Sequence, residues 1–424
     1  MPRLNTPADA DTSIVTLRNG VRIVVLRLPL LATAGVSVFV RSGSQHESAR
    51  QNGIGHVIEH MAFKGTRRRD CQRINLDAER LGAEVNAHTD KDHTAFHMRG
   101  LARDAATFIR MLGDIVREST FPAVELARER NVILHEYAED EDDAMSTAFK
   151  LFDRACFGAH PAARPVIGTR ANIGRFTHGD LAAWVQQQYT AANTIVGVAG
   201  DVEPERIVAA ARAAFGSMPA GSDNLVGAPA WRGGTRLRNL PGSSLVHVVL
   251  GFPIPALPAA HPAFVVAAAL LGEGMSSPLL DRLRERRGLV YHADCWTDTR
   301  DAWGQFVIEA STAPEHLREY LGAVARLLRQ QAETTDRVGL GRARRQAQVR
   351  VLSMREEPAR RLETAALDLY ALGRVRSREE LLAGLAAVTP GQVRAAFAQM
   401  LAATPAIGIA GRIPRGEAER LARR

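Results

Sequence analysis

Cysteine, aromatic residues and long apolar runs are all scarce in this chain of 424 residues. Three widely spaced cysteines, Cys71, Cys156 and Cys295, fit neither a disulfide framework nor a CxxC metal site, and so favour a reducing compartment. The first fifteen residues lack the apolar core of a secretory signal. The longest apolar runs, such as PAFVVAAALLG from Pro262, are too short to span a bilayer. We therefore expect a soluble, cytoplasmic protein without a membrane partner.

The bulk composition is that of an ordinary globular protein. Hydrophobic residues make up 46% of the chain and charged residues 24%, with a net charge of +8 carried largely by arginine. The arginines alternate with Glu and Ala instead of forming a basic block, and no aromatic-plus-basic recognition module is visible. We expect no nucleic-acid partner. The length favours two or more domains.

Two stretches, beginning at Thr177 and Thr389, resemble each other. Each opens with a Thr-x-Gly helix start, continues as an amphipathic helix and reaches a short apolar strand that ends in Gly200 or Gly411. The two glycines are 211 residues apart, almost half of the chain length. This pattern indicates a duplicated unit.

The stretch between the halves, residues 217–244, is rich in Gly, Pro and Ser, as an exposed interdomain linker would be. Runs of β-branched residues, VRIVVLRLPL and GVSVFVRSGS in the first half and LVHVVLGFPI in the second, predict that strands open each half. We predict an α+β fold with two domains, residues 1–216 and 245–424. Each should have a mainly antiparallel sheet covered by helices.

HVIEH at residues 56–60 is the first motif that suggests chemistry. Apolar residues fill the gaps between its polar positions, which predicts a helix entered through Gly53 and closed near Gly65. Residues four apart share a helix face, so His56 and His60 can direct their imidazoles at one ion. Glu59 can then reach a water on that ion. Two solvent-facing histidines are the alternative that this motif alone leaves open.

ERNVILHEY at residues 129–137 supplies two further carboxylates. Glu129 and Glu136 are seven residues apart, two helical turns, and therefore share a face. Glu136 can complete a His-His-Glu set, with Glu129 behind it to orient a histidine. For Glu136 alone, an ordinary solvated carboxylate is the alternative.

Together, HVIEHMAFKGT and ERNVILHEY resemble the pitrilysin-type (M16) zinc metallopeptidases, the inverzincins. In that family a glutamate 76 residues after the second histidine is the third zinc ligand, and Glu136 lies 76 residues after His60. The resemblance implies that His56, His60 and Glu136 hold one zinc ion per chain. It also implies that Glu59 is the general base and Glu129 the supporting carboxylate.

LGAEVNAHTDKDHTAFH, from Leu81, resembles the family's NA-x-T strand, whose exposed edge pairs with the substrate backbone. The resemblance implies that Asn86, Ala87 and Thr89 bind substrate by strand addition. Alternating apolar positions after Thr89 predict a strand independently. His88 and His93 are interpreted as strand or turn residues and not as ligands. FGAHPAARPVIGT resembles a loop of the family, in which His160 is expected to be structural.

LLGEGMSSPLLDRLRERRGLVYH, in the second half, resembles the family's GGGMSSRL…REKRGLAY. Arg284 and Tyr291 match a pair that lies near the scissile bond in active members. The resemblance implies that they hold the peptide carbonyl and stabilise the oxyanion. Pro278 and Glu273 depart from the family's usual Arg and Gly. Without the zinc motif, an arginine-rich helix beside a buried tyrosine would be the simpler interpretation.

The resemblance extends over nearly the whole chain and implies two duplicated LuxS/metallopeptidase-like domains. It implies a zinc endopeptidase that hydrolyses unfolded peptides, or leader and precursor peptides, inside a chamber formed when chains pair. One chain carries both the ligand set and the Arg/Tyr pair, which favours a homodimer over a heterodimer with a related subunit. The alternative is a non-catalytic structural or substrate-presenting subunit, but such members typically lose HxxEH or the distant glutamate.

Two charged features lie around Glu136. His135 occupies a position that is usually acidic or polar in the family, and we expect it on the surface. The acidic run EDEDD at residues 139–143 is interpreted as a solvated face, with attraction of basic peptides as the alternative.

Overall fold

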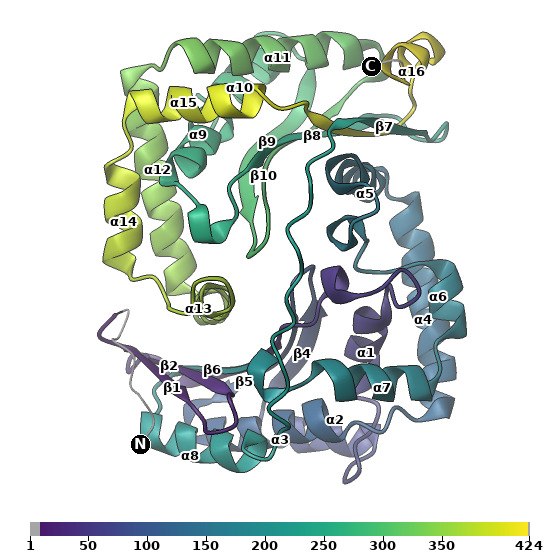
Figure 1. Ribbon diagram of the computed structural model, residues 1–424, viewed down its shortest axis with the longest axis vertical. Coiled ribbons are helices and arrows are strands. Elements are labelled where there is room, and N and C mark those ends of the chain that lie inside the picture. The colour runs from purple at the N-terminus through teal and green to yellow at the C-terminus, as the bar shows by residue number, and fades with distance from the viewer. Residues whose placement is uncertain (1–8, 423–424) are drawn as a thin grey trace. The chain divides into compact units, whose positions relative to one another are not determined.

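The apolar, β-branched runs of the sequence form the strands of two separate sheets in the computed structural model, which describes residues 9–422 (Figure 1). The chain divides into two compact units. The first comprises residues 9–137, Arg164–Val226 and Met354–Ser377, and the second comprises Ala138–Ala163, Gly227–Ser353 and residues 378–422. Each unit is an α+β structure built on one of the sheets, as predicted.

The sheet of the first unit has the strand order β1-β2-β6-β3-β5-β4. Its strands are β1 (Thr12–Thr16), β2 (Arg22–Arg27), β3 (Thr33–Val40), β4 (Glu84–Thr89), β5 (Thr94–Leu101) and β6 (Thr194–Gly200). Only β2 and β6 pair in parallel; the remaining pairs are antiparallel. Strand β4 therefore lies at one edge of this sheet, next to β5.

The sheet of the second unit repeats this topology in the order β7-β11-β8-β10-β9. Its strands are β7 (Gly234–Asn239), β8 (Val246–Ile254), β9 (Val290–Thr299), β10 (Gly304–Thr312) and β11 (Ala406–Gly411). Here β11 pairs with β7 in parallel and with β8 in antiparallel fashion, just as β6 pairs with β2 and β3. The shared strand order explains the two similar stretches of the sequence.

The helices that precede these middle strands have matching starts. Thr177 caps α7 (His178–Gln188) and Thr389 caps α15 (Pro390–Leu401), and in each case the residue three positions later completes a reciprocal capping box. The other helices of the first unit are α1 (Ile54–Ala62), α2 (Cys71–Glu79), α3 (Ala105–Glu118), α6 (Arg170–Arg175), α8 (Pro204–Phe215), α13 (Pro358–Leu372) and α4 (Ala123–Asp142), whose last turn belongs to the second unit. Those of the second are α5 (Ala144–Phe157), α9 (Pro262–Gly272), α10 (Pro278–Leu280), α11 (Leu317–Glu333), α12 (Arg337–Glu356), α14 (Arg378–Ala386) and α16 (Arg415–Ala422).

One helix in each unit comes from the opposite half of the sequence. Helix α13 packs on one face of the first sheet, through Leu362, Ala366 and Leu369, while helices of the N-terminal half, such as α1, α3 and α8, cover the other face (Figure 1). Helix α5 packs on the second sheet in the same way, opposite α9, α11 and α15. The duplicated fold thus exchanges a helix between its halves.

A pair of glycines, also 211 residues apart, permits this packing. A Cβ atom on Gly197 in β6 would come within 3.0 Å of Leu362 on α13. A Cβ atom on Gly408 in β11 would come within 2.1 Å of the carbonyl oxygen of Ala148 on α5. The glycines therefore let the exchanged helices lie close to the middle strands.

Because of this exchange, the compact units do not follow the two halves of the sequence. The predicted domains, 1–216 and 245–424, treat each half as continuous, whereas α5 and α13 each belong with the other half's sheet. The predicted linker, 217–244, also contains strand β7, where the alternating exposed side chains of a sheet edge resemble the polar composition of a loop. Its first part packs on the first unit, since Asn224 hydrogen-bonds the carbonyl oxygen of Arg41.

No single helix within residues 9–422 is both long enough and apolar enough to cross a membrane. The pair α14 and α15, bent by 89°, satisfies the length and composition criteria only when the two are taken together. Val393 and Phe397 of α15 lie in the core of the second unit.

Candidate metal centre

Helix α1 begins at a tightly built turn. Gly53 has φ +98°, a left-handed conformation that favours glycine, and a Cβ atom there would lie 2.8 Å from the Cα of Gly168. The buried carboxylate of Glu47 accepts hydrogen bonds from the backbone N–H groups of Gly53, at 2.8 Å, and of Gly55, at 2.9 Å. These contacts fix the direction in which α1 leaves the turn.

The amphipathic pattern of α1 decides which side chains reach the site. Val57, Ile58 and Met61 are buried in the core of the first unit. His56 and His60, one turn apart, leave this apolar face and are 15% and 17% exposed. The HVIEH segment therefore forms the predicted helix, with both imidazoles on its partly exposed side.

Helix α4 crosses near α1 and carries both predicted carboxylates. Ile133 of α4 is fully buried, and the guanidinium of Arg130 donates to the carbonyl oxygens of Ile173 and Phe176. These contacts hold the helix so that the side chains of Glu129 and Glu136, two turns apart, point toward α1.

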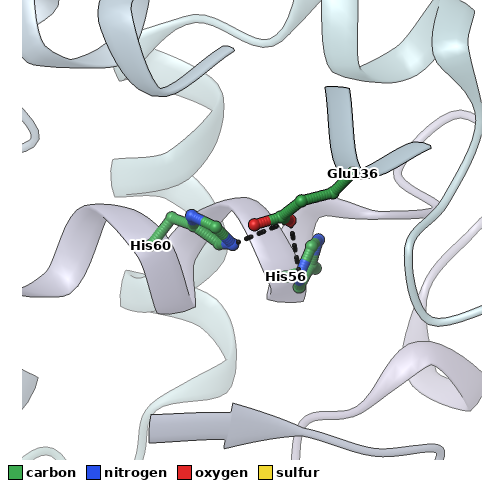
Figure 2. A group of neighbouring side chains, drawn as sticks. All are labelled: His56, His60 and Glu136. Carbon is green, nitrogen blue, oxygen red and sulfur yellow. Dashed lines mark ion pairs between the residues drawn. The ribbon is translucent and has the colours of Figure 1, made fainter. Parts of the chain in front are cut away.

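His56, His60 and Glu136 come together although Glu136 is distant in the sequence. Figure 2 shows the Glu136 carboxylate between the two imidazole rings. Its Oε2 lies 3.7 Å from His56 Nε2 and 3.3 Å from His60 Nε2. Ligands of a tetrahedral zinc ion are about 3.3 Å apart, since Zn–N and Zn–O bonds are about 2.0–2.1 Å long. Two imidazoles and one carboxylate thus fit a zinc ion with a position open for water.

Glu129 lies behind His60. Its Oε2 is 3.2 Å from His60 Nδ1, and its Oε1 is 2.6 Å from Lys64 Nζ. A carboxylate can only accept, so Nδ1 donates to Glu129, and Nε2 on the other side of the ring is the nitrogen available to a metal. This is the arrangement that orients metal-ligating histidines in proteins.

Glu59 lies on α1 between the histidines and near strand β4. Burial raises the pKa of its carboxyl group, although the hydrogen bond from Thr89 and the nearby His60 act against that rise. A raised pKa suits a general base, because a base titrating closer to neutral pH takes up a proton more readily.

The predicted substrate-binding residues lie on the edge strand β4. Asn86 is exposed, and its Oδ1 accepts from the backbone N–H of Ala87 at 2.8 Å. Thr89 turns inward, with its hydroxyl bonded to Glu59 and 3.3 Å from the hydroxyl of Thr94. The side chain of Thr89 therefore contacts the predicted base, while Asn86 and Ala87 remain at the edge.

Arg284 and Tyr291 lie together in the second unit. The Arg284 guanidinium is 5.6 Å from the centre of the Tyr291 ring, and Tyr291 is 81% exposed. The arginine also donates to the sulfur of Met275. The sequence alone also allowed Tyr291 to be a buried aromatic residue beside an arginine-rich helix. Because Tyr291 is exposed and lies under the Arg284 guanidinium, that interpretation is wrong.

The two departures from the family's loop have local roles. Pro278 begins α10 behind the cap residue Ser277, where a proline needs no N–H partner. Glu273 pairs with Arg350 at 3.0 Å.

The charged features around Glu136 are surface and structural elements. His135 is exposed, as expected. Within the acidic run, Asp143 caps α5, while Asp140 and Glu141 both pair with Lys150 at 2.7 Å. The run therefore serves the start of α5 and is not wholly a solvated face.

The loop that contains His160 is structural, as expected. The His160 ring accepts from the backbone N–H of Ala162, and the following residues supply the Gly168 contact with Gly53. Two residues near the site were missed by the sequence reasoning, Glu47 and Lys64. A carboxylate six residues before a Gly-x-Gly helix start, and a lysine one turn after His60, are the signals that point to them.

Comparison with known proteins agrees with this geometry. Residues 22–170 match the family model described as insulinase (peptidase family M16), and residues 175–346 match that of the peptidase M16 inactive domain. The chain belongs to peptidase family M16.

Individual M16 relatives align along nearly the full length of this chain. A protein named as an uncharacterized zinc protease from Streptomyces coelicolor is 30% identical over 96% of this chain and 91% of its own. A peptidase M16 inactive domain from Pseudomonas fluorescens superposes with a TM-score of 0.85 at 21% identity, covering 95% of this chain and 99% of that structure. A protease from Helicobacter pylori gives 0.84 at 20% identity, covering 97% and 100%. The structural likenesses show the fold.

Proposed function

We propose that this M16 protein is a zinc-dependent endopeptidase that hydrolyses unfolded peptides, or leader and precursor peptides. The observation that carries the proposal is that Glu136 Oε2 lies 3.7 Å from His56 Nε2 and 3.3 Å from His60 Nε2, close to the spacing of ligands around a tetrahedral ion. The names of the zinc-protease relatives support the choice of metal.

His56, His60 and Glu136 would hold one zinc ion, which when bound polarises a water for attack on a peptide carbonyl. Glu59 takes the proton of that water and passes a proton to the departing amine. Its raised pKa supports this role, as does its hydrogen bond from Thr89, which fixes the orientation of the carboxylate.

Strand β4 would bind the substrate backbone by strand addition, because it lies at the end of the six-stranded sheet. The Ala87 N–H bonds to the Asn86 side chain and would be released to a substrate carbonyl when that side chain rotates. Arg284 and Tyr291 would hold the scissile carbonyl and stabilise the oxyanion. Their exposure and mutual contact support a role in binding.

We further propose that the chains pair as homodimers in the cytoplasm and enclose the substrate in a chamber. The presence of both the ligand set and the Arg/Tyr pair in one chain supports this, since no second kind of subunit is then needed to supply either.

The test is chelator-sensitive cleavage of an unstructured peptide by the purified chain, with zinc content measured in parallel. We expect about one zinc at the His-His-Glu site, activity that is lost with chelator and regained with zinc. Glu59→Gln should keep the zinc and lower turnover by about 10²–10⁴-fold. Absence of metal and of cleavage would instead identify a structural or substrate-presenting subunit. Full activity in Glu59→Gln would exclude Glu59 as the base.

A further inference from the structure

His88, His93 and Glu363 form a second group of metal-ligating side chains in the first unit. His88 is on β4, His93 is in the turn before β5, and Glu363 is on the exchanged helix α13. His88 Nε2 lies 3.3 Å from His93 Nε2, and the Glu363 Oε1 lies 3.6 Å and 3.5 Å from these two nitrogens. Three ligand atoms thus form a nearly equilateral triangle.

The size of this triangle matches a metal site. Ligands of a tetrahedral ion with bonds of about 2.0–2.1 Å are about 3.3 Å apart. The edges here are 3.3, 3.5 and 3.6 Å, and the distances between Glu136 and its two histidines are 3.3 and 3.7 Å. The donor set, two imidazole nitrogens and one carboxylate oxygen, is also the same.

The far side of His93 is held by a carboxylate. Asp92 Oδ1 lies 2.7 Å from His93 Nδ1, and because it can only accept, Nδ1 carries the proton. With a metal ion in the triangle, Nε2 would then be the nitrogen that binds it. Glu129 orients His60 in the same way, so both groups contain the carboxylate–histidine arrangement of metal sites.

The far side of His88 is held by a short chain of hydrogen bonds. His88 Nδ1 lies 2.9 Å from His97 Nε2, and His97 Nδ1 lies 2.8 Å from the hydroxyl of Ser37. A neutral imidazole has one N–H, which it can direct to only one of its two neighbours. When that N–H donates to Ser37, His88 donates to His97 and turns its own lone pair into the triangle.

Two imidazole nitrogens and a carboxylate oxygen at this spacing form the donor set of a divalent-cation site. A divalent ion would satisfy all three groups at once. His93 is fully buried, whereas His88 and Glu363 are 40% and 36% exposed, which leaves an open side for entry and for a water ligand.

We propose that His88, His93 and Glu363 form a second divalent-cation site, which takes Zn²⁺ or another borderline transition metal. Imidazole donors disfavour Mg²⁺ and Ca²⁺, which prefer oxygen ligands alone. The site ties α13 to the edge of the first sheet. Because side chains alternate along a strand, Thr89 faces α1 and Glu59 while His88 faces α13, so the metal supports β4 from the opposite side.

The experiment uses the full chain, stripped with chelator and titrated with Zn²⁺ or Co²⁺, with bound metal measured by mass spectrometry. We expect about two equivalents per chain, one for each three-ligand group. Glu363→Gln or His88→Ala should reduce this to about one, and so should His60→Ala, through the other group. In the His60→Ala background, zinc should still raise the melting temperature, and adding Glu363→Gln should abolish that rise.

His292→Ala is the matched control. His292 is exposed and lies 3.3 Å from Glu309, so it is a histidine beside a carboxylate without a third ligand among the described side chains. It should leave the stoichiometry unchanged. The proposal is overturned if the wild-type chain binds one equivalent that only His60→Ala removes, or if Glu363→Gln and His88→Ala bind as much as the wild type. Neither outcome depends on peptidase activity, so the proposed function is tested separately. If Glu363→Gln does not fold, His88→Ala tests the site instead, because His88 is partly exposed and its loss should be tolerated.

Discussion

Glu129 joins His60 to Lys64: one of its oxygens lies 3.2 Å from His60 Nδ1 and the other 2.6 Å from Lys64 Nζ. The lysine holds the carboxylate in place, and the carboxylate accepts from the imidazole nitrogen that faces away from Glu136. The basicity and the direction of His60 Nε2 therefore depend on a residue that does not itself join the ligand set.

Glu129→Gln should weaken zinc binding by about 10–100-fold, because a neutral amide orients the imidazole less strongly. The measurement is competition for zinc with a chromophoric chelator. Glu125→Gln is the control, since Glu125 lies on the same helix and pairs with the exposed Arg128. Equal zinc affinities for Glu129→Gln and the wild type would contradict the role given to Glu129.

Tyr291→Phe should lower kcat by about 10²-fold or more, if its hydroxyl stabilises the oxyanion, with zinc content unchanged. The melting temperature should not move, because the side chain is 81% exposed. Tyr370→Phe is the control, in which stability should fall and kcat should not change. Its hydroxyl donates to the carbonyl oxygen of Asn193, so its loss should cost about 1 kcal/mol of stability and leave kcat near the wild-type value. An unchanged kcat in Tyr291→Phe would remove Tyr291 from the mechanism.

Glu47 should make the stability of the chelator-treated protein depend on pH. Burial raises the pKa of its carboxyl group from 4.5 to about 7, despite hydrogen bonds from Asn52, Gly55 and Gly53. Between these values the folded state binds one proton more than the unfolded state, so the free energy of unfolding falls as pH rises. The loss is complete above pH ~7 and amounts to about 3 kcal/mol.

Urea unfolding at pH ~5, ~6 and ~7.5 tests this, with Glu47→Gln as the variant that cannot ionise. A glutamine has one acceptor oxygen where Glu47 has two, and these two accept from Asn52, Gly53 and Gly55. The absolute stability of the Glu47→Gln protein should therefore be lower than that of the wild type. Its stability should nevertheless decline less with pH than that of the wild type. Identical declines in the two proteins would show that Glu47 does not titrate in this range.

Gly408→Ala should destabilise the second unit by about 1–3 kcal/mol or more, because the new methyl group meets backbone atoms of α5 that cannot move aside. Its Cβ would lie 2.1 Å from Ala148 O and 2.5 Å from Phe152 N. Gly341→Ala, in α12, has no atom within 4 Å of the new Cβ and should stabilise by about 0.5–1 kcal/mol. Thermal unfolding of both variants gives the comparison, and a Gly408→Ala protein as stable as the wild type would refute the tight packing of α5.

Local patterns in the sequence were enough to predict α1 and the shared face of His56 and His60, because residues four apart meet on any helix. The duplicated topology was also predictable, since each half contains the same helix, strand and glycine in the same order. Glu136 could be assigned to the same site as the histidines only through the family spacing. The periodicity of a helix or strand does not tell which residues 76 positions apart will meet.

The cluster of His88, His93 and Glu363 was beyond prediction for a physical reason. It exists only because α13, from the second half of the sequence, packs on the first sheet. The amphipathic pattern of α13 predicts a buried face but does not predict which sheet that face will cover. Gly197 and Gly408 mark the places where a helix comes close to a middle strand, but a glycine in an apolar strand does not identify that helix. Strand β7 was hidden for a related reason, because its polar edge resembles a linker.

The exchange of α5 and α13 also sets an order of events during synthesis. The first sheet leaves the ribosome long before residue 358, where α13 begins, so one of its apolar faces stays uncovered until most of the chain has been translated. The first unit cannot reach its finished state as a nascent fragment. Chains that stop short of α13 will expose that face and become substrates for chaperones or for degradation.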